Sequence, residues 1–265
     1  RLNNTNNDTT FLGQQNIIII TRYRFILNTM FKEDAMRVND RHVSFYYQND
    51  MDRGEVEIDP KKTAVLVIDM QHQFITRPQL ENPTELEQAE AERWEQFYRA
   101  IDDIVVPNNQ RIIRAFRDKH MEVIFAKIQA RKRNGTDRSL VQKATGYNEL
   151  LLLEGDPLGE IVPELAPQDD EIVIAKTTDS ALSGSALRLW LHNMDIDTVV
   201  VTGVLLDQCV SGTVRSLADE SFKVWLIEDA CRSATEEIQN NELEILNNIY
   251  CHVINTDELL EALGV

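Results

Sequence analysis

A cysteine that follows an apolar run is the residue of this sequence best placed for nucleophilic chemistry. The run Val199–Val201 ends in Thr202 and Gly203, and after a short turn the chain enters a helical pattern with Cys209 near its first turn. The exposed N–H groups and the dipole at the start of a helix favour an anion there. We therefore expect the Cys209 thiol to ionise more easily than a free thiol and to act as a nucleophile. A buried, inert cysteine is the ordinary alternative.

Two further ionisable residues stand where apolar runs end. Asp69 comes directly after the run 64–68, and Lys176 follows the run 171–174. In an open α/β sheet, ligands bind beyond the carboxyl ends of the strands, so an acid, an amine and a thiol at three strand ends can form one site. The carboxylate can accept the thiol proton, and the ammonium can keep the carboxylate ionised. Each residue alone is more often structural or solvated, and only their joint placement favours catalysis.

The elements that must position these residues follow from the apolar pattern. Short apolar runs indicate strands at 64–68, 122–126, 171–174, 198–202, 223–227 and 251–254. Helical spacing indicates helices at 183–193, 209–221, 235–248 and 257–263. A further helix begins near Thr84, with Glu87 completing a capping box. Its apolar stripe is expected to face the core and consists of Trp94, Phe97, Tyr98, Ile101 and Ile104. Pro107 should separate this helix from another at 109–119.

Apolar strands that alternate with amphipathic helices favour a parallel sheet covered on both faces. We therefore predict an α/β fold of three αβα layers around a six-stranded, mostly parallel sheet in the strand order 3-2-1-4-5-6. This domain should occupy residues 61–265, and residues 1–60 are interpreted as an N-terminal extension or arm. The segment 128–160 is long and poor in pattern, which favours an active-site loop.

The composition excludes several classes of protein. The chain has 265 residues, of which 43% are hydrophobic and 27% charged, which is typical of a globular protein. A formal net charge of −17 argues against a nucleic-acid partner, because phosphates need clustered Lys and Arg. No apolar run reaches the about 18 residues of a membrane helix, so we expect no membrane association. Three cysteines, an odd number, favour reduced thiols and a cytoplasmic location: Cys209, Cys231 and Cys251.

Several stretches together resemble the isochorismatase-like cysteine hydrolases. They are VLVIDMQHQF (65–74), IAKTTDSALSGSAL (174–187), VVVTGVLLDQCVSGTVRS (199–216) and EDACRS (228–233). The catalytic Asp, Lys and Cys of that family fall on Asp69, Lys176 and Cys209. The resemblance implies that Asp69 deprotonates Cys209 and that the thiolate attacks a carbonyl carbon. An amine then leaves, and water hydrolyses the thioester while Lys176 orients and stabilises the site.

The resemblance also carries expectations for the turn before the cysteine. It implies an oxyanion hole formed by the backbone N–H groups of Leu205 and Cys209, and a cis peptide bond between Val204 and Leu205. Leu205 and Leu206 stand where the family has smaller residues or threonine, so the pocket should differ in shape.

Metal binding distinguishes one branch of this family. Nicotinamidases bind a metal through an Asp-x-His pair after the second strand, where this chain reads AKIQARKRNG (126–135) without a histidine. His72 alone does not make a zinc site, which needs three or more convergent ligands. We therefore predict no metal and no cofactor, and nicotinamidase activity is disfavoured.

A complete Asp–Lys–Cys set favours C–N hydrolysis over the vinyl-ether cleavage of isochorismatase, which does not require a thiol. We predict an amidohydrolase acting on a small amide, ureido or carbamoyl substrate and releasing ammonia or an amine. The basic run Arg131–Arg133 could meet a substrate carboxylate, although a solvated loop is an equal alternative. Further pocket candidates are Gln71, Phe74, Tyr98 and Arg232.

Other functions stay open at this point. An isochorismatase-type ether hydrolase and a non-catalytic binding protein on the same fold are the main alternatives. A dinucleotide-binding domain is disfavoured, because no Gly-rich turn follows the first strand. Because members of the family commonly form dimers or tetramers, we expect a homodimer or homotetramer.

Overall fold

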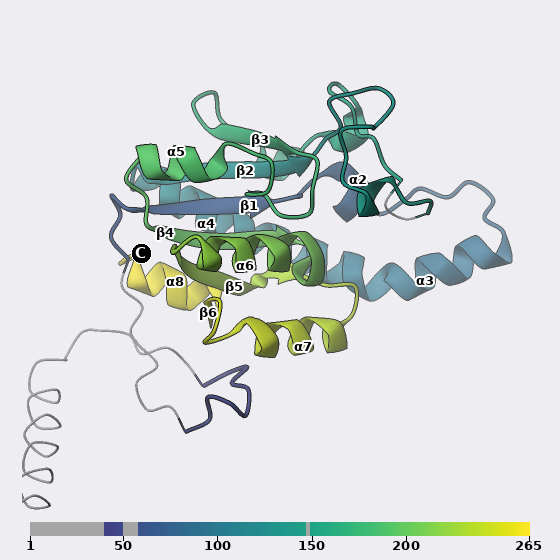
Figure 1. Ribbon diagram of the computed structural model, residues 1–265. Coiled ribbons are helices and arrows are strands. Elements are labelled where there is room, and N and C mark those ends of the chain that lie inside the picture. The colour runs from purple at the N-terminus through teal and green to yellow at the C-terminus, as the bar shows by residue number, and fades with distance from the viewer. Residues whose placement is uncertain (1–39, 50–57, 147–148) are drawn as a thin grey trace, which may run out of the picture. The chain divides into compact units, whose positions relative to one another are not determined.

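Six parallel strands form the centre of the molecule, as Figure 1 shows. The computed structural model describes residues 40–49, 58–146 and 149–265. The strands are β1 (Thr63–Ile68), β2 (Glu122–Ile128), β3 (Ile172–Lys176), β4 (Thr198–Val204), β5 (Lys223–Arg232) and β6 (His252–Ile254). Their order in the sheet is β3-β2-β1-β4-β5-β6, and every neighbouring pair is parallel. This confirms the predicted fold class and strand order.

The central strands form where the sequence is continuously apolar. Every residue of β1 and of β4 is buried, because helices cover both faces of the sheet. β5 is longer than the predicted strand at 223–227. A register shift between Val201 and Gly203 of β4 lets β5 pair again at Cys231 and Arg232. Glu228 and Asp229, which follow the predicted strand at 223–227, therefore lie inside β5.

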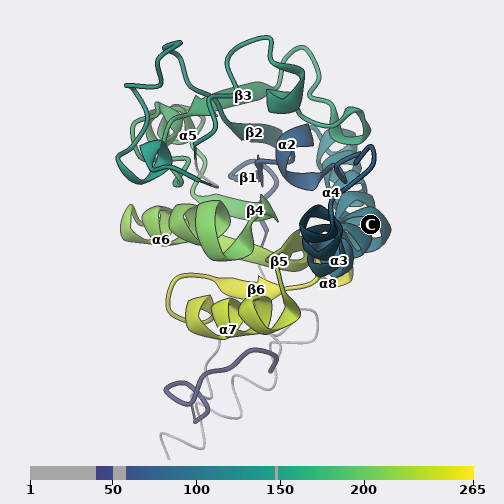
Figure 2. The ribbon, with the colours of Figure 1, turned by 90° about the vertical axis from the view of Figure 1, so that its right-hand side faces the viewer.

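Helices pack on both faces of the sheet (Figure 2). On one face lie α3 (Glu85–Ala100), α4 (Val106–Asp118) and α8 (Thr256–Ala262), whose apolar side chains join the core cluster that contains Val65 and Val67. On the other face lie α5 (Leu187–Asn193), α6 (Ser211–Asp219) and α7 (Glu236–Leu246), which pack in the cluster that contains Leu66 and Ile68. Because successive side chains of β1 point to opposite faces of the sheet, this strand contributes to the hydrophobic core on each face.

The aromatic helix α3 follows the prediction with two exceptions. Its capping box between Thr84 and Glu87 is present, and Phe97 and Ile101 are buried. Ile104, predicted to face the core, is 48% exposed. The reason is a π-helical turn at Ile101–Val105, which changes the helical spacing. This turn also joins α3 directly to α4, where Pro107 fits in the first turn instead of breaking the helical path.

The helix predicted at 183–193 begins only at Leu187. Hydroxyl groups hold the preceding residues in turns: Ser185 Oγ donates to the Ala181 carbonyl oxygen at 2.5 Å, and Thr178 Oγ1 donates to the Ser183 carbonyl oxygen at 2.8 Å. Such bonds compete with helical hydrogen bonding.

Part of the expected N-terminal arm packs on the main domain. Arg41 pairs with Glu228 at 2.7 Å and also contacts Glu258, and His42 Nε2 lies 2.6 Å from Glu228 Oε2. The segment 40–49 therefore belongs to the compact unit Val38–Val265. The rest of the arm, apart from 58–60, lies outside the described residues, so its expected role and the boundary at residue 60 stay predictions. No helix among the described residues is long and apolar enough to cross a membrane.

Gly203 is the glycine on which the sheet depends most directly. Its φ is +117°, and a Cβ placed there would lie 2.0 Å from the Ile68 carbonyl oxygen. Because β1 and β4 approach so closely at this point, we predict that Gly203→Ala lowers the free energy of unfolding by about 3 kcal/mol. Urea denaturation measures this loss.

Gly155→Ala is the matched control, since Gly155 also has a positive φ of +83° but no atom within 4 Å of the added Cβ. It should lose roughly 1 kcal/mol, the cost of the left-handed backbone alone. Equal losses for the two variants would contradict a packing role for Gly203.

Candidate active site

The sheet register brings Asp69 and Lys176 to the same edge of the sheet. Ile68 pairs with Ala126 and also with Gly203, and Lys176 pairs with Ile128. Asp69 follows β1 with φ +51°, a left-handed conformation that is uncommon for a non-glycine residue. Its N–H donates to the Ala126 carbonyl oxygen at 2.8 Å, which holds this backbone in place.

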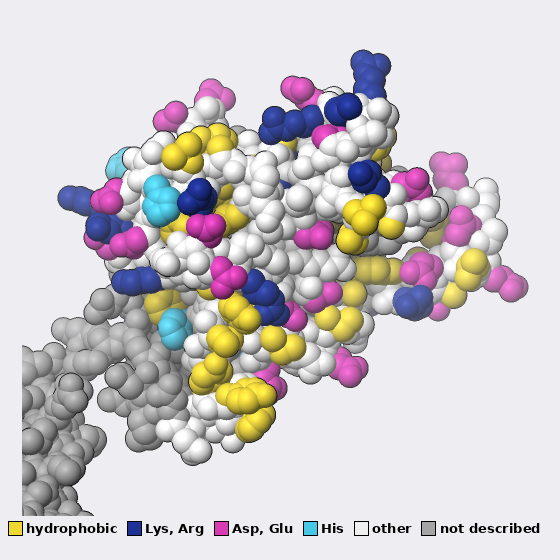
Figure 3. Space-filling view, in the orientation of Figure 1, with side chains coloured by type: hydrophobic (Ala, Val, Ile, Leu, Met, Phe, Trp, Pro, Cys, Tyr) yellow, Lys and Arg dark blue, Asp and Glu magenta, His cyan; other side chains and the backbone are white. Residues whose placement is uncertain are grey.

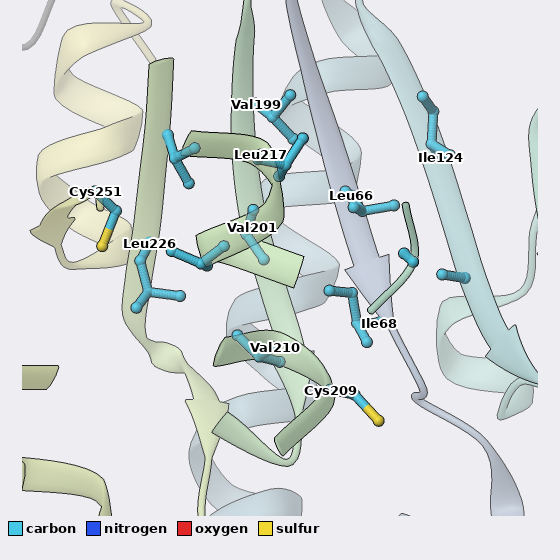
Figure 4. Packing of buried hydrophobic residues seen from close by; sticks show 14 of the residues in the cluster. Leu66, Ile68, Ile124, Val199, Val201, Cys209, Val210, Leu217, Leu226 and Cys251 are labelled. Atoms are coloured by element: carbon cyan, nitrogen blue, oxygen red, sulfur yellow. The ribbon is translucent and has the colours of Figure 1, made fainter. Parts of the chain in front are cut away.

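Cys209 reaches this edge from a turn after β4. The peptide bond between Val204 and Leu205 is cis, as the family resemblance implied. A π-helical turn, Leu206–Val210, then carries Cys209 and continues into α6. In Figure 4 the Cys209 sulfur lies beyond Ile68 and Val210 and points away from the apolar cluster. Cys209 is only 5% exposed.

Lys176 connects the other two residues. Its Nζ lies 2.7 Å from Asp69 Oδ2, and both side chains are buried. The same Nζ donates to Cys209 Sγ at 3.3 Å and to the Thr178 carbonyl oxygen at 3.3 Å. An ammonium has three N–H donors, so all three of them have acceptors here. The structure thus brings together the three residues that the sequence predicted as a set.

Burial is the largest influence on the pKa values of Asp69 and Lys176. It raises the pKa of Asp69, and the charge of Lys176 only partly opposes the rise. Burial also lowers the pKa of Lys176, but Asp69 and Cys209 together raise that pKa above its ordinary value. A carboxylate with a raised pKa is a stronger base than an exposed one, which suits it to accept a proton.

The prediction that the Cys209 thiol ionises easily is wrong. Burial, followed by the charge of Asp69, raises the pKa of this thiol well above its usual value, and the opposing charge of Lys176 does not compensate. Desolvation of the thiolate and two nearby carboxylates outweigh the favourable start of the helix. The direction of this shift favours the protonated thiol over the thiolate.

A narrow cavity opens beside the thiol, with a volume of about 20 Å³. Its apolar lining residues are Phe74, Ile128, Leu150, Val204 and Leu205. Its polar lining residues are Asp69, Cys209, Arg138, Gln142, Asp179 and Gln208. Leu205 lines the cavity as expected, whereas Leu206 is buried in the core.

Of the predicted substrate contacts, Phe74 lines this cavity and the others lie elsewhere. Gln71 is buried and its side-chain amide bonds the Ile128 backbone and the Gly159 carbonyl oxygen. Tyr98, a residue of α3, packs against the core, and the Arg77 guanidinium lies over its ring. Arg131 is exposed, and Arg232 lines a separate hollow near His42 and Glu228.

The loop that the sequence indicated lines the cavity, but with Arg138 and not with Arg131. The segment 128–160 does border the cavity, and it contributes Arg138, Gln142 and Leu150. Arg131 and Lys132 instead donate their backbone N–H groups to Asp137, which folds the exposed tip of the loop. Asp179 was also missed, although it stands only three residues after Lys176. No periodic pattern marks these residues.

No group of three or more His, Cys, Asp or Glu side chains suited to a metal occurs in the part of the chain that the structure describes. His72, the histidine considered above, has its Nδ1 3.0 Å from Thr76 Oγ1 in a partly exposed position. On the face seen in Figure 3, acidic and basic side chains are interspersed over the surface.

The fold and the site define an αβα protein with a thiol, an ammonium and a carboxylate at one edge of a parallel sheet. Residues 63–258 match the family model of the isochorismatase domain, so the chain belongs to the isochorismatase family. This is a family of hydrolases, and the resemblance drawn from the sequence is confirmed.

Three known proteins illustrate the similarity. N-carbamoylsarcosine amidase of Arthrobacter sp is 27% identical over 61% of this chain and 62% of its own length. A probable inactive nicotinamidase of Arabidopsis thaliana is 27% identical over 71% of this chain and 90% of its own. A cysteine hydrolase structure from Pseudomonas syringae pv. phaseolicola 1448A shares the fold, with a TM-score of 0.65 and 24% identity over 79% of this chain and 95% of that one. The chain spans 53–62% of the length of several curated relatives.

The buried ion pair leads to a prediction about stability. Lys176→Met leaves the Asp69 carboxylate buried without its cation, so we expect the free energy of unfolding at pH 7.5 to fall by about 3 kcal/mol. Without Lys176, the folded-state pKa of Asp69 rises further above its unfolded value. The protonated acid is tolerated, so the deficit should be smallest at low pH and should grow as the pH rises through the folded-state pKa.

Urea denaturation at pH 5 and pH 7.5 tests this. The double variant Asp69→Asn, Lys176→Met is the control, because it carries no buried charge at these two positions and should recover part of the lost stability. A deficit below about 1 kcal/mol, or one independent of pH, would show that the pair is not desolvated.

The raised thiol pKa leads to a second prediction. Alkylation of Cys209 by iodoacetamide, followed by mass spectrometry of its peptide, should be slow at pH 7 and still increase above pH 9. Asp69→Asn removes a charge that raises the thiol pKa, so its alkylation profile should shift to lower pH. A plateau below pH 8 in the unsubstituted protein would contradict a protonated thiol.

Proposed function

We propose that this protein is a cysteine amidohydrolase that cleaves a C–N bond of a small amide, ureido or carbamoyl substrate through a thioester. The observation that carries the proposal is the buried contact of Lys176 Nζ with both Asp69 Oδ2 and Cys209 Sγ beside an open cavity. The similarity to N-carbamoylsarcosine amidase supports this choice of substrate class.

The first step is attack by the thiol. As a carbonyl group enters the cavity, Asp69 takes the proton from Cys209 Sγ while the sulfur bonds to the carbonyl carbon. Since the thiol is protonated beforehand, proton removal and attack belong to one event, and the raised pKa of Asp69 favours it. Lys176 donates to the sulfur and offsets the negative charge near it.

The later steps return the protein to its starting state. The N–H groups of Leu205 and Cys209 are the proposed donors to the oxyanion. When the C–N bond breaks, Asp69 gives its proton to the leaving nitrogen, and ammonia or an amine departs. Asp69 then deprotonates a water molecule, whose oxygen attacks the thioester carbonyl carbon. As the C–S bond breaks, Asp69 returns this proton to the Cys209 sulfur, and the acid or carbamate is released. The protein needs no redox partner for this sequence.

A screen for ammonia release tests the proposal with ureides, carbamoyl amino acids and simple amides. Cys209→Ala should lower turnover by at least about 10³-fold, and Asp69→Asn by about 10²- to 10⁴-fold. Cys231→Ala is the matched control, because Cys231 is a buried thiol that does not line the cavity, and it should retain activity.

The outcomes separate the remaining alternatives. Full turnover by Cys209→Ala would overturn the thioester mechanism and favour ether hydrolysis by the acid alone. Turnover of no member of the screen would favour a non-catalytic protein, a possibility supported by the relative described as a probable inactive nicotinamidase. A homodimer or homotetramer remains the proposed assembly.

A further inference from the structure

A second carboxylate, that of Asp179, lies near the Cys209 thiol, and the mechanism proposed above assigns it no role. Asp179 Oδ1 lies 3.9 Å from Cys209 Sγ, and Asp179 lines the same cavity. It comes from the turn after β3, three residues beyond Lys176, and its side chain is accessible to solvent. Asp69 already serves as the proposed base, so Asp179 is not needed for that role. Its negative charge also opposes the formation of a thiolate at Cys209, so its presence there needs another explanation.

Two buried side chains hold Asp179 in place. Gln142 is 2% exposed, and its Nε2 donates to Asp179 Oδ1 at 2.9 Å. Arg138 is 5% exposed, and its guanidinium donates to Gln142 Oε1 at 3.3 Å. Because a guanidinium can only donate, Arg138 must face the carbonyl oxygen of the Gln142 side chain. The NH₂ group of Gln142 is therefore directed toward Asp179. The loop before β3 therefore supplies two residues that orient one carboxylate.

The geometry fits a contact with the leaving nitrogen of a substrate. A carbonyl carbon about to be attacked lies roughly 3–3.5 Å from the sulfur. The nitrogen bonded to that carbon can then lie at a hydrogen-bond distance from Asp179 Oδ1, which is itself 3.9 Å from the sulfur. A carboxylate only accepts hydrogen bonds, so it favours a leaving group that carries N–H and disfavours an ester oxygen.

We propose that Asp179 selects the leaving group of the substrate by accepting its N–H, and that Gln142 and Arg138 are positioning residues for Asp179. This inference rests on the proposed amidohydrolase function. As Asp69 protonates the leaving nitrogen and the C–N bond breaks, Asp179 stabilises the positive charge that develops there and takes no proton itself. The substrate class is a primary or secondary amide or ureide, whose leaving nitrogen has a hydrogen to donate.

The test compares an amide with the methyl ester of the same acid, chosen from the amides that the protein turns over. Asp179→Asn should lower kcat/KM for the amide about 10- to 100-fold, the loss expected for a hydrogen bond to a charged group, and should leave the ester unchanged or faster. Gln142→Leu should lower the amide-to-ester ratio in the same direction by a smaller factor. Glu154→Gln, an exposed carboxylate on the same loop, is the control and should change neither.

Equal losses for amide and ester in Asp179→Asn would overturn the role of Asp179 but leave the proposed function standing, provided that Cys209→Ala is inactive. If the unsubstituted protein turns over no amide, the affinity for an amide and for the matching ester tests the inference instead. Calorimetry on Cys209→Ala with propionamide and methyl propionate should then show tighter binding of the amide, with the difference abolished by Asp179→Asn. No difference between these two probes would overturn the inference.

Discussion

The contact between Lys176 and Asp69 is the interaction on which the rest of the structure depends. Removing two charges from water costs several kcal/mol each unless partners replace the lost hydration. Lys176 meets three acceptors, Asp69, Cys209 and a backbone carbonyl oxygen, so its charge is tolerated only where segments from β1, β3 and β4 end together. The parallel sheet brings these strand ends together, and β1 and β4 approach closely where Ile68 pairs with Gly203.

The same burial determines how the site can react. Burial raises the pKa of Asp69, which makes it a stronger base, and it also raises the pKa of the Cys209 thiol. In the mechanism proposed above, the nucleophile is therefore formed when a substrate arrives, instead of being held as a thiolate in advance. The cavity has a mixed lining. Apolar side chains such as Phe74 and Leu205 line it together with polar ones such as Asp179.

Much of the fold and the central set of residues could be predicted, because the signals are local. An apolar run of five to seven residues between polar turns identifies a buried strand wherever the strand lies in the sheet, and Asp69 and Lys176 follow such runs directly. Ile104 was misplaced because a π-helical turn changes the helical spacing without a marker in the sequence. Arg138, Gln142 and Asp179 were missed because the loop that positions two of them has no repeating pattern.

The sequence by itself determined the order of the strands and helices and the three residue types at the strand ends. These follow from the apolar spacing of neighbouring residues and from a family pattern carried in short stretches. Only the tertiary structure decided the protonation of Cys209, the arginine that borders the cavity and the second carboxylate beside the thiol. Ionisation depends on burial and on distances between groups, and Asp69 and Cys209 are brought together from segments that are far apart in the chain.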